Sequence, residues 1–519
     1  MIPLFSSKDV READNFAINI LQMPSIVLME NAARSIYEAI IENFSENEFY
    51  NVGIICGKGN NGGDGFTLAR HFLINEFDVT IISLANENEL KGDALTNFII
   101  TKKLIDSYPN SKMIIYQSID SLALLSDCDL IVDAILGTGS KGSLSNELQS
   151  IVNYLNKLEA YKISVDIPTG LNVETATGET IYKADLTVTL SEFKTGLFYG
   201  KGYSHCGKIV KGSIGIGDLY YETIQTNDYL IEPEDAFYGL PEKNISAHKY
   251  SNGKVLVVAG SGKYVGAACL TANAVLRSGA GACFLAFPKS IKNIALEKLE
   301  SPVLIAYEDQ AKEFVHLENY DELKEKIDWA DSIAIGPGLG RENGTIQFIH
   351  KLLEENKNKK IVIDADALFA INKCYKNFDL SNKILTPHHK EFADLISISI
   401  DELENNLLNI GRTFSVENNC YLVLKGAPTI IFNPMGEVFI NSSGNVGMAK
   451  FGTGDVLTGV IASFVAQSKE IEISLISAVY LHSLAADLLI PKKTEYGIIP
   501  QNIIEEFPNA IKFLVDSFV

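Results

Sequence analysis

The sequence has 519 residues, of which 46% are hydrophobic and 21% are charged, and its formal net charge is −21. A single hydrophobic core rarely grows beyond about 250–300 residues, so this length predicts two large domains. The acidic balance argues against a nucleic-acid partner, because a polyanion requires a basic protein face. We therefore expect small-molecule ligands, and local groups such as helix N-termini must hold any that are anionic.

Cysteine use and the N-terminus indicate the compartment. The seven cysteines are an odd number, are widely spaced and form no CxxC pair, as is typical of reduced thiols in a cytoplasmic protein. The N-terminus lacks a basic segment followed by an apolar run, and no stretch reaches the roughly 18 apolar residues of a membrane span. We expect a cytoplasmic protein with no membrane partner and with self-association into a homo-oligomer.

The apolar pattern along the chain predicts an α/β fold. Residues 1–48 read as helical, and from about residue 50 short apolar runs at 51–57, 79–85, 129–136 and 161–168 alternate with helical stretches. This alternation is typical of βαβ units on a parallel sheet. A second series of the same kind begins at residue 254, after a polar and aromatic segment without clean periodicity. We therefore place one domain at 1–217, a linker at 218–240 and a second domain at 241–519.

A glycine-rich motif, GKGNNGGDG at 57–65, follows the first apolar run of the first domain and precedes a helical stretch. It satisfies the GxGxxG pattern, whose glycines let backbone N–H groups approach a phosphate. The next strand ends in Ala85 and Asn86 rather than in the acidic residue that a dinucleotide-binding fold uses for the ribose, which weakens an oxidoreductase interpretation. The polar residues within the motif favour a binding site over the alternative, a solvated surface turn.

Two further predicted strands of the first domain end in acidic residues followed by turn signals, at Asp133 and at Asp166. The carboxyl ends of parallel strands gather at one edge of a sheet, where ligands bind, so both residues should lie near the 57–65 motif. Each aspartate by itself is equally consistent with an ordinary cap at a strand end. Three such ends at one edge favour a site.

The second domain has a candidate anion site in FGTGDVLTGVIASFVAQ at 451–467, where Gly452, Gly454 and Asp455 precede an apolar helical run. Free N–H groups at a helix start suit a transferring phosphate, and an aspartate there can accept a proton from an attacking hydroxyl. A lone aspartate in a first helical turn is also explained by the helix dipole. We read 421–432 as one strand carrying Lys425 and place His388 after another strand, where it is equally consistent with a plain loop histidine.

The motifs of the first domain resemble the NAD(P)H-hydrate epimerases. The resemblance covers about residues 20–217 and rests on LMENAARS, GKGNNGGDG, VDAILGTG, VDIPTGLN and ADLTVTLSEFKTGLF in that order. It implies a Rossmann-like three-layer domain in which Asp166 binds the hydrated cofactor beside the reacting ring. It also implies a potassium ion on Asn61, Asp133 and Thr169, whose oxygen atoms are suitable hard ligands. The implied contacts to the hydrate are Asn60, Asn61, Gly62, Gly63, Asp64, Gly137, Thr138, Gly139, Ser140, Lys141, Gly142 and Ser143.

The second domain resembles the ADP/ATP-dependent NAD(P)H-hydrate dehydratases over about residues 240–490, which implies a ribokinase-like α/β fold. The resemblance rests on the segment 248–281 and on IGPGLG, IDADAL, TPHHKE and FGTGDVL, where TPHHKE replaces the family's TPHPGE and FGTGD its GGTGD. It implies that ADP or ATP acts with Mg²⁺. The implied hydrate contacts are Ala267, Gly338, His388 and Asp455, and the implied nucleotide contacts are Lys425, Gly426, Ala427, Pro428, Thr429 and Gly454.

Together these motifs predict an enzyme that repairs hydrated NADH and NADPH. Asp455 would be the base for nucleotide-dependent dehydration, and Asp166 the acid–base group for epimerisation at C6 of the hydrated ring. One alternative is a ribokinase-type small-molecule kinase fused to a nucleotide-binding domain, since such kinases also use an aspartate after glycines to deprotonate an alcohol. The other is a nucleotide sensor without turnover, against which Asp455 and Asp166 argue.

Overall fold

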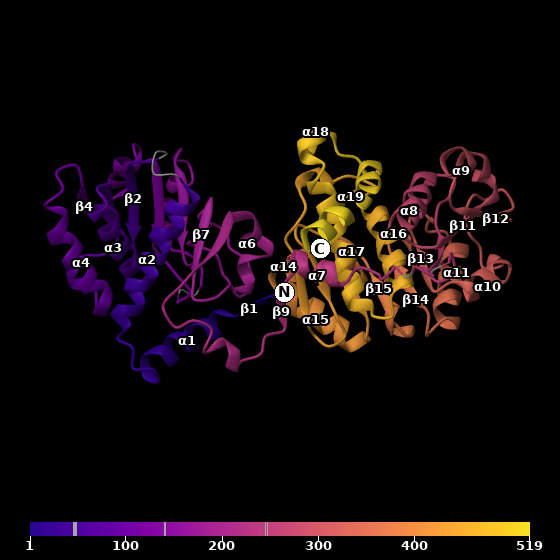
Figure 1. Cartoon of the computed structure of the whole chain (residues 1–519), viewed down its shortest axis with the longest axis horizontal. Helices are drawn as coiled ribbons and strands as arrows, with labels where there is room; N and C mark the ends of the chain where they lie inside the picture. The colour runs from indigo at the N-terminus through magenta and orange to yellow at the C-terminus, as the bar shows by residue number, and fades with distance from the viewer. Residues whose placement is uncertain (45–48, 140–141, 244, 247, 519) are drawn as a thin grey trace. The chain divides into compact units, whose positions relative to one another are not determined.

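The computed structural model describes residues 1–44, 49–139, 142–243, 245–246 and 248–518. The chain divides into two compact units, one of Pro3–Thr226 and one of Met1–Ile2 with Asn227–Val519 (Figure 1). The division falls inside the segment 218–240 that we expected to be a linker. The later part of that segment forms β9 (Asp228–Leu230) and α7 (Pro233–Tyr238).

The unit Pro3–Thr226 has a seven-stranded parallel sheet in the order β4-β3-β2-β5-β6-β7-β8. This is the strand order of a doubly wound Rossmann-like sheet, and the order reverses between β2 and β5. Its strands are β2 (Asn51–Cys56), β3 (Asp78–Ser83), β4 (Lys112–Ile115), β5 (Leu130–Ala134), β6 (Tyr161–Val165), β7 (Leu186–Leu190) and β8 (Lys208–Gly212). Its helices are α1 (Ser7–Asn19), α2 (Ser25–Asn43), α3 (Asn60–Ile74), α4 (Gly92–Ile105), α5 (Asn146–Leu155) and α6 (Gly200–His205).

Helices cover both faces of this sheet, so the unit has three layers. Val52, Ile54 and Cys56 of β2 join the hydrophobic cluster beneath α2, α3 and α4, whereas Ile55 joins the cluster beneath α5. This is the alternation of side chains along a strand, with both faces buried as is usual for a parallel sheet. The expected Rossmann-like three-layer domain is confirmed.

The second unit has an eleven-stranded sheet in the order β1-β9-β18-β17-β16-β15-β14-β13-β10-β11-β12. Its strands from β12 to β16 are parallel, and β17 and β18 continue antiparallel. The strands are β1 (Ile2–Leu4), β9, β10 (Lys254–Val258), β11 (Ala282–Pro288), β12 (Val303–Tyr307), β13 (Ser332–Ile335), β14 (Lys360–Ile363), β15 (Lys383–Leu385), β16 (Tyr421–Leu424), β17 (Thr429–Phe432) and β18 (Val438–Asn441). In the parallel part the order reverses between β10 and β13, where a ligand site is expected.

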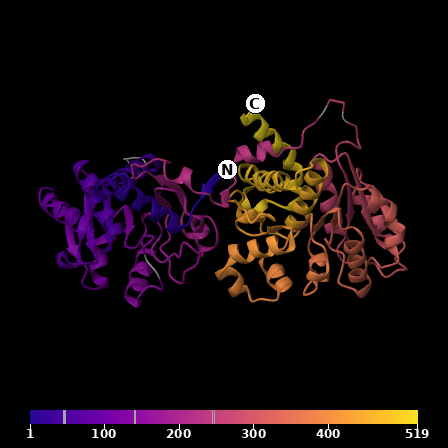
Figure 2. The ribbon, with the colours of Figure 1, turned by 90° about the horizontal axis from the view of Figure 1, so that it is seen from below.

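The helices of the second unit also lie on both faces of its sheet. Helices α8, α16, α17 and α19 pack on one another, and α16 covers β10, β13 and β14. Figure 2 shows the C-terminal helices of this group, in yellow, on the opposite side of the sheet from the orange helices that precede β16. The helices are α7, α8 (Val265–Arg277), α9 (Lys292–Lys298), α10 (Asn319–Trp329), α11 (Asn343–Glu355), α12 (Asp366–Ala370), α13 (His389–Ile396), α14 (Ile400–Asn405), α15 (Leu407–Asn418), α16 (Thr453–Gln467), α17 (Ile471–Asp487), α18 (Ile490–Gly497) and α19 (Pro500–Phe518).

Three expected elements differ in the structure. The single strand predicted at 421–432 is wrong: β16 and β17 form an antiparallel pair joined by a turn. The reason is Pro428, which has no N–H to donate and is excluded from the middle of a central strand. Residues 1–48 are not all helical, since β1 precedes α1, and the motif at 57–65 is a loop only as far as Gly59, because α3 begins at Asn60.

All seven cysteines are free thiols, and six of them are buried, as the sequence predicts. Over the described ranges, no single helix has both the length and the apolar character to cross a membrane. The consecutive helices α17 and α18 meet those criteria only as a pair, and the two are bent by 92°.

Candidate active sites

The glycine-rich motif of the first unit lies at the carboxyl edge of the sheet, where the strand order reverses. A Cβ added at Gly57 would lie 2.0 Å from the carbonyl oxygen of Ile135, and one at Gly62 would lie 1.9 Å from the carbonyl oxygen of Gly57. Only glycine permits this approach of the loop to the end of β5. Of the polar residues in the motif, Asn61 and Asp64 are buried and Asn60 is exposed.

Asp133 and Thr169, two of the three predicted potassium ligands, are in direct contact. The carboxylate of Asp133 is fully buried and accepts hydrogen bonds from Thr169 N and Thr169 Oγ1, both at 2.7 Å, and from Ile135 N at 3.1 Å. Burial raises the pKa of Asp133 to about 6, although these hydrogen bonds act in the opposite direction. No cationic side chain among the described residues forms an ion pair with Asp133.

Asn61, the third predicted potassium ligand, has an unsatisfied buried amide. Its Nδ2 has no hydrogen-bond partner within the described part of the chain, and a Cβ added at Gly137 would lie 3.2 Å from its Oδ1. An unsatisfied buried N–H group costs free energy, which an acceptor atom on a bound ligand would offset. The donor set of carboxylate, hydroxyl and amide oxygens fits a hard cation, and the buried anion at Asp133 lacks a counter-charge.

Asp166 forms a buried ion pair that the sequence did not reveal. Its Oδ1 lies 2.7 Å from Nζ of Lys194, whose side chain has no exposure to solvent. Lys194 also donates to Thr189 Oγ1 at 2.8 Å and to the Leu190 carbonyl at 2.9 Å. The Asp166 carboxylate accepts from the backbone N–H groups of Leu190 and Thr138, and its own φ is 68°, an uncommon value for a non-glycine residue.

The signal for Lys194 in the sequence is a lone lysine just after an apolar run, inside the motif ADLTVTLSEFKTGLF.

Of the predicted loop at 137–143, Ser140 and Lys141 lie outside the described residues. Thr138 contacts Asp166, whereas Gly142 and Ser143 are exposed. The pKa of Asp64 is raised well above its usual value by burial first and then by the negative charges of Asp166 and Asp14.

In the second unit, Gly338 and Ala267 meet where the strand order reverses. Gly338 follows β13 with a φ of 63°, and a Cβ added there would lie 3.1 Å from the Cβ of Ala267 and 2.6 Å from that of Tyr264. A larger residue at 338 would therefore be strained and would also clash with α8. The two predicted hydrate contacts thus lie at the same opening of the sheet.

Lys425 links three loops at the carboxyl edge of the second sheet. Its Nζ lies 2.7 Å from Oδ1 of the buried Asp364, and Thr458 Oγ1 donates to the other oxygen of that carboxylate at 2.6 Å. A Cβ added at Gly454 would lie 3.2 Å from Lys425 Nζ, so the start of α16 lies against this ammonium group. Asp364 was not among the predicted site residues, although it belongs to the motif IDADAL that ends β14.

Asp455 lies in the first turn of α16, behind Gly452, whose φ is 97°. The pKa of Asp455 is raised to about 7, first by burial and then by the negative charge of Asp364, while Lys425 acts in the opposite direction. The helix start offers free N–H groups for an anion, and the carboxylate changes its protonation state near neutral pH. A hydroxyl group can therefore lose its proton here next to a bound phosphate.

His388 is placed beside Lys425 but acts as a helix cap. The two residues form an isolated β-bridge in which Lys425 N donates to the Pro387 carbonyl at 2.8 Å. The Nδ1 of His388 accepts from Glu391 N at 3.2 Å at the start of α13, and about half of the His388 side chain is exposed. Of the remaining predicted nucleotide contacts, residues 426–428 lie in the turn between β16 and β17 at the same edge. Thr429 begins β17, and its Oγ1 donates to the Gly426 carbonyl.

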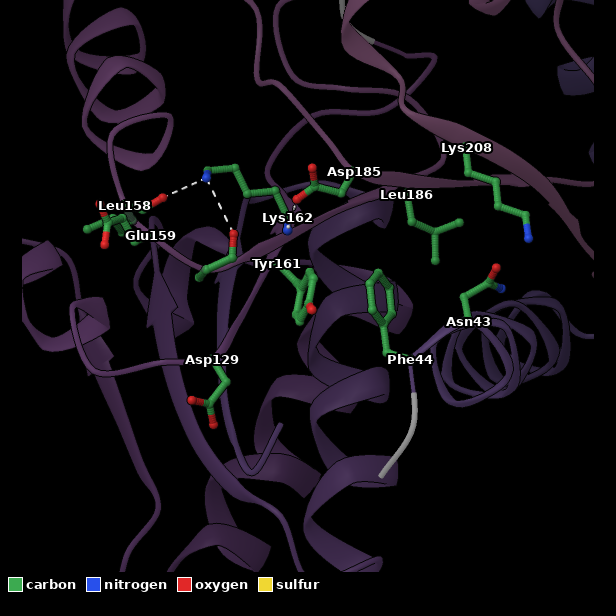
Figure 3. Close-up of a pocket in the computed structure, with 11 residues that line it drawn as sticks. Asn43, Phe44, Asp129, Leu158, Glu159, Tyr161, Lys162, Asp185, Leu186 and Lys208 are labelled. Atoms are coloured by element: carbon green, nitrogen blue, oxygen red, sulfur yellow. Dashed lines mark hydrogen bonds between the residues drawn. The ribbon is translucent and has the colours of Figure 1, made fainter. Parts of the chain in front are cut away.

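A separate cavity lies at the opposite edge of the first sheet. It has a volume of about 860 Å³ and is lined by side chains from the amino ends of β5, β6, β7 and β8 together with the end of α2 (Figure 3). Lys162 in its wall donates to the carbonyl groups of Leu158 and Ala160. Ligands of doubly wound sheets bind at the carboxyl ends of the strands, so this cavity is not the candidate active site.

Comparison with known proteins matches both units to known families. Residues 25–196 match the family described as YjeF-related protein N-terminus, and residues 255–509 match the family described as NAD(P)H-hydrate dehydratase. The bifunctional NAD(P)H-hydrate repair enzyme of Moorella thermoacetica is 33% identical, with 99% of this chain and 97% of the relative covered. The enzyme of the same name from Escherichia coli K12 is 29% identical, with 97% and 93% covered.

Among solved structures, a ribokinase-like superfamily protein from Enterococcus faecalis is 28% identical to this chain, with a TM-score of 0.50, and covers 56% of this chain and 98% of its own. The expected ribokinase-like fold of the second unit is thereby confirmed. The full-length matches favour hydrate repair over the alternative of a small-molecule kinase. The chain belongs to the bifunctional NAD(P)H-hydrate repair enzymes, and its second unit is an NAD(P)H-hydrate dehydratase.

Proposed function

We propose that residues 1–217 interconvert the R and S hydrates of NADH and NADPH at C6, and that residues 241–519 dehydrate the S hydrate at the expense of ADP or ATP. The observation that carries this proposal is Asp455, a carboxylate with a pKa near 7 in the first turn of α16, beside the ammonium group of Lys425. Such a group accepts a proton near neutral pH while the helix start binds the phosphate.

Dehydration requires a better leaving group than hydroxide. The hydroxyl oxygen at C6 attacks the terminal phosphorus of the nucleotide and loses its proton to Asp455. The bond from that phosphorus to its bridging oxygen breaks, which leaves AMP when the donor is ADP. The lone pair of the ring nitrogen then expels phosphate with its bonding electrons, and loss of a proton from C5 restores the dihydropyridine. The N–H groups at the start of α16 stabilise charge on the transferring group.

The other residues of this site bind the two substrates. Lys425 to Thr429 and Gly454 contact the nucleotide, with Lys425 held in place by its ion pair with Asp364. Ala267, Gly338 and His388 contact the hydrate, and Gly338 lies close to the start of α8, beside Ala267.

Mg²⁺ would accompany the nucleotide. The three carboxylates near the start of α16 are Asp364, Asp366 and Asp455, and each of the first two raises the pKa of the third. Among the described residues, no three or more histidine, cysteine or acidic side chains are grouped so that they could hold a metal ion by themselves. Mg²⁺ is usually held by one or two carboxylates together with substrate phosphates and waters. The ion would neutralise phosphate charge.

In the first unit, Asp166 exchanges protons with the hydrate, and residues 60–64 and 137–143 bind it. Asn61, Asp133 and Thr169 would hold a potassium ion, which would compensate the buried charge of Asp133 and fix the carboxyl edge of the sheet. The carboxylate of Asp133, which has no cationic partner, and the hydroxyl oxygen of Thr169 in contact with it support this assignment. A homo-oligomeric state and a cytoplasmic location remain predictions.

The proposal is tested with separated epimers of NADH hydrate. The S hydrate with ADP should yield NADH and AMP, and omission of the nucleotide should abolish the reaction. The R hydrate should yield NADH only while epimerisation is active, so Asp166→Asn should slow conversion of R and leave that of S unchanged. Phosphorylation of a sugar alcohol or a vitamin, with no turnover of either hydrate, would reject hydrate repair.

A further inference from the structure

The N-terminal helix α1 is bound directly to the loops of the epimerase site. Phe5 N donates to the Phe193 carbonyl at 2.9 Å, and Thr195 N donates to the Phe5 carbonyl at 3.1 Å. These two bonds tie the segment before α1 to both neighbours of Lys194 in the chain. The next turn is fixed as well, because Ser7 N donates to Glu174 Oε1 at 3.0 Å. Helix α1 precedes residues 25–196, the segment that matches the family of the first unit.

Thr138 connects α1 with Asp166. Its backbone N–H donates to Asp166 Oδ2 at 3.4 Å, and its carbonyl accepts from Nη1 of Arg11 at 3.0 Å. Asp14 lies three residues after Arg11, and residues three apart lie on the same face of a helix. Helix α1 therefore presents Asp14 on the face that is turned to the Asp166 loop.

Asp14 is half-buried, and no hydrogen bond to its carboxyl group is found within the described ranges. Four charged or titratable groups interact electrostatically with Asp14, each from a different segment. They are Asp64 of α3, Asp166 after β6, Lys194 after β7, and Tyr221 near the end of the unit. Burial, followed by the charge of Asp166, raises the pKa of Asp14 to about 6, and Lys194 acts in the opposite direction.

Epimerisation at C6 needs one proton given and one taken, whichever bond breaks. If the C6–O bond breaks, an acid protonates the leaving oxygen, water departs with the bonding electrons, and water then adds to the other face and loses a proton to a base. If the C6–N1 bond breaks, a base takes the hydroxyl proton and an acid protonates N1; the ring then recloses on the other face in the reverse steps. Two titratable groups, one that gives the proton and one that takes it, meet this need.

We propose that Asp14 is a second acid–base residue of the epimerase site, which gives the proton while the ion-paired Asp166 takes one. This inference rests on the proposed epimerase function of the first unit. Asp64 is less suited to the role, because it is almost fully buried and burial raises its pKa well above the usual value. Asp14 is half-buried rather than fully buried, and with a pKa of about 6 it can both lose and regain a proton near neutral pH.

The test compares Asp14→Asn with Glu12→Gln in the full-length protein. Glu12 lies on the same helix and is exposed, so its variant removes one carboxylate from α1 without touching the site. We expect conversion of the R to the S hydrate, corrected for the reaction without enzyme, to fall by roughly 10²–10⁴-fold in Asp14→Asn, the usual contribution of a positioned acid or base. Glu12→Gln should match the wild type.

The pH dependence separates a catalytic role from a structural one. Wild-type epimerisation should slow as the pH rises above about 6, because Asp14 then ionises, and Asp14→Asn should lack this dependence. Dehydration of the S hydrate and the thermal unfolding temperature report that the variant is folded. Near wild-type epimerisation by Asp14→Asn, with Asp166→Asn inactive, would overturn the role of Asp14 alone. Full epimerisation by both variants would instead overturn the proposed epimerase site.

Discussion

Replacement of Asp455 by asparagine should strongly slow dehydration and at the same time stabilise the protein. Asparagine keeps the size of the side chain and the start of α16 but cannot accept a proton from the substrate hydroxyl. A positioned general base contributes about 10²–10⁴-fold, or roughly 3–5 kcal/mol of barrier. Dehydration of the S hydrate at saturating ADP should fall by that factor, while the separate epimerase reaction should be unchanged.

The gain in stability follows from the raised pKa of Asp455. The folded protein keeps this carboxyl protonated up to about pH 7, whereas the unfolded chain ionises it near pH 3.8. The stability that the protonated group contributes is therefore complete below pH 3.8 and is lost as the pH rises through 7. A shift of about three units corresponds to at most about 4 kcal/mol, and partial exposure of the side chain reduces the expected effect to about 1–3 kcal/mol.

Denaturant unfolding with and without the substitution measures this difference directly. At pH 8 Asp455→Asn should be more stable than the wild type, and at pH 4 the two should be nearly equal. The helix dipole acts in the opposite sense, but a carboxylate in a first turn gains only about 0.3–1 kcal/mol from it. A variant that dehydrates the hydrate at nearly the wild-type rate would refute the reasoning, because Asp455 would then be only a helix-start residue and His388 the next base to test.

Three further predictions concern the separate folding of the two units, the potassium ion, and the contact between Lys425 and the nucleotide. Fragments cut between Thr226 and Asn227 should each fold and keep one activity, as circular dichroism and the two assays would report; a folded N-terminal fragment without epimerisation would contradict the assignment of functions. Epimerisation should slow when a large organic cation replaces potassium, and Asp133→Ala should be insensitive to that exchange; an equal cation response in the variant and the wild type would remove the ion from the account. Lys425→Met should weaken ADP binding by roughly 10-fold or more in calorimetry, since a charge-assisted contact contributes about 1.5–3 kcal/mol; unchanged affinity would exclude a contact between Lys425 and the phosphates.

The sequence predicted the fold because parallel sheets leave a strong local pattern. Short apolar runs that are buried on both faces, separated by helical stretches, identify βαβ units without any knowledge of tertiary contacts. The acidic residues after β5 and β6 could be placed at one edge for the same reason, since the topology collects the carboxyl ends of parallel strands. The split of 421–432 into β16 and β17 was also encoded locally, by Pro428, but the continuous apolar character on both sides concealed it.

The sequence by itself thus determined the α/β class, two large domains, and the glycine and aspartate motifs that carry the resemblance to the hydrate repair enzymes. Only the tertiary structure decided which charges meet. Lys194 and Asp166 lie 28 residues apart in the chain, and Lys425 and Asp364 lie 61 residues apart. The approach of Asp14 to the epimerase site likewise depends on hydrogen bonds between α1 and loops more than 100 residues away. The raised pKa values of Asp14, Asp133 and Asp455 were also decided by the tertiary structure. Burial is their largest cause, and burial is a property of the packed fold rather than of any local segment.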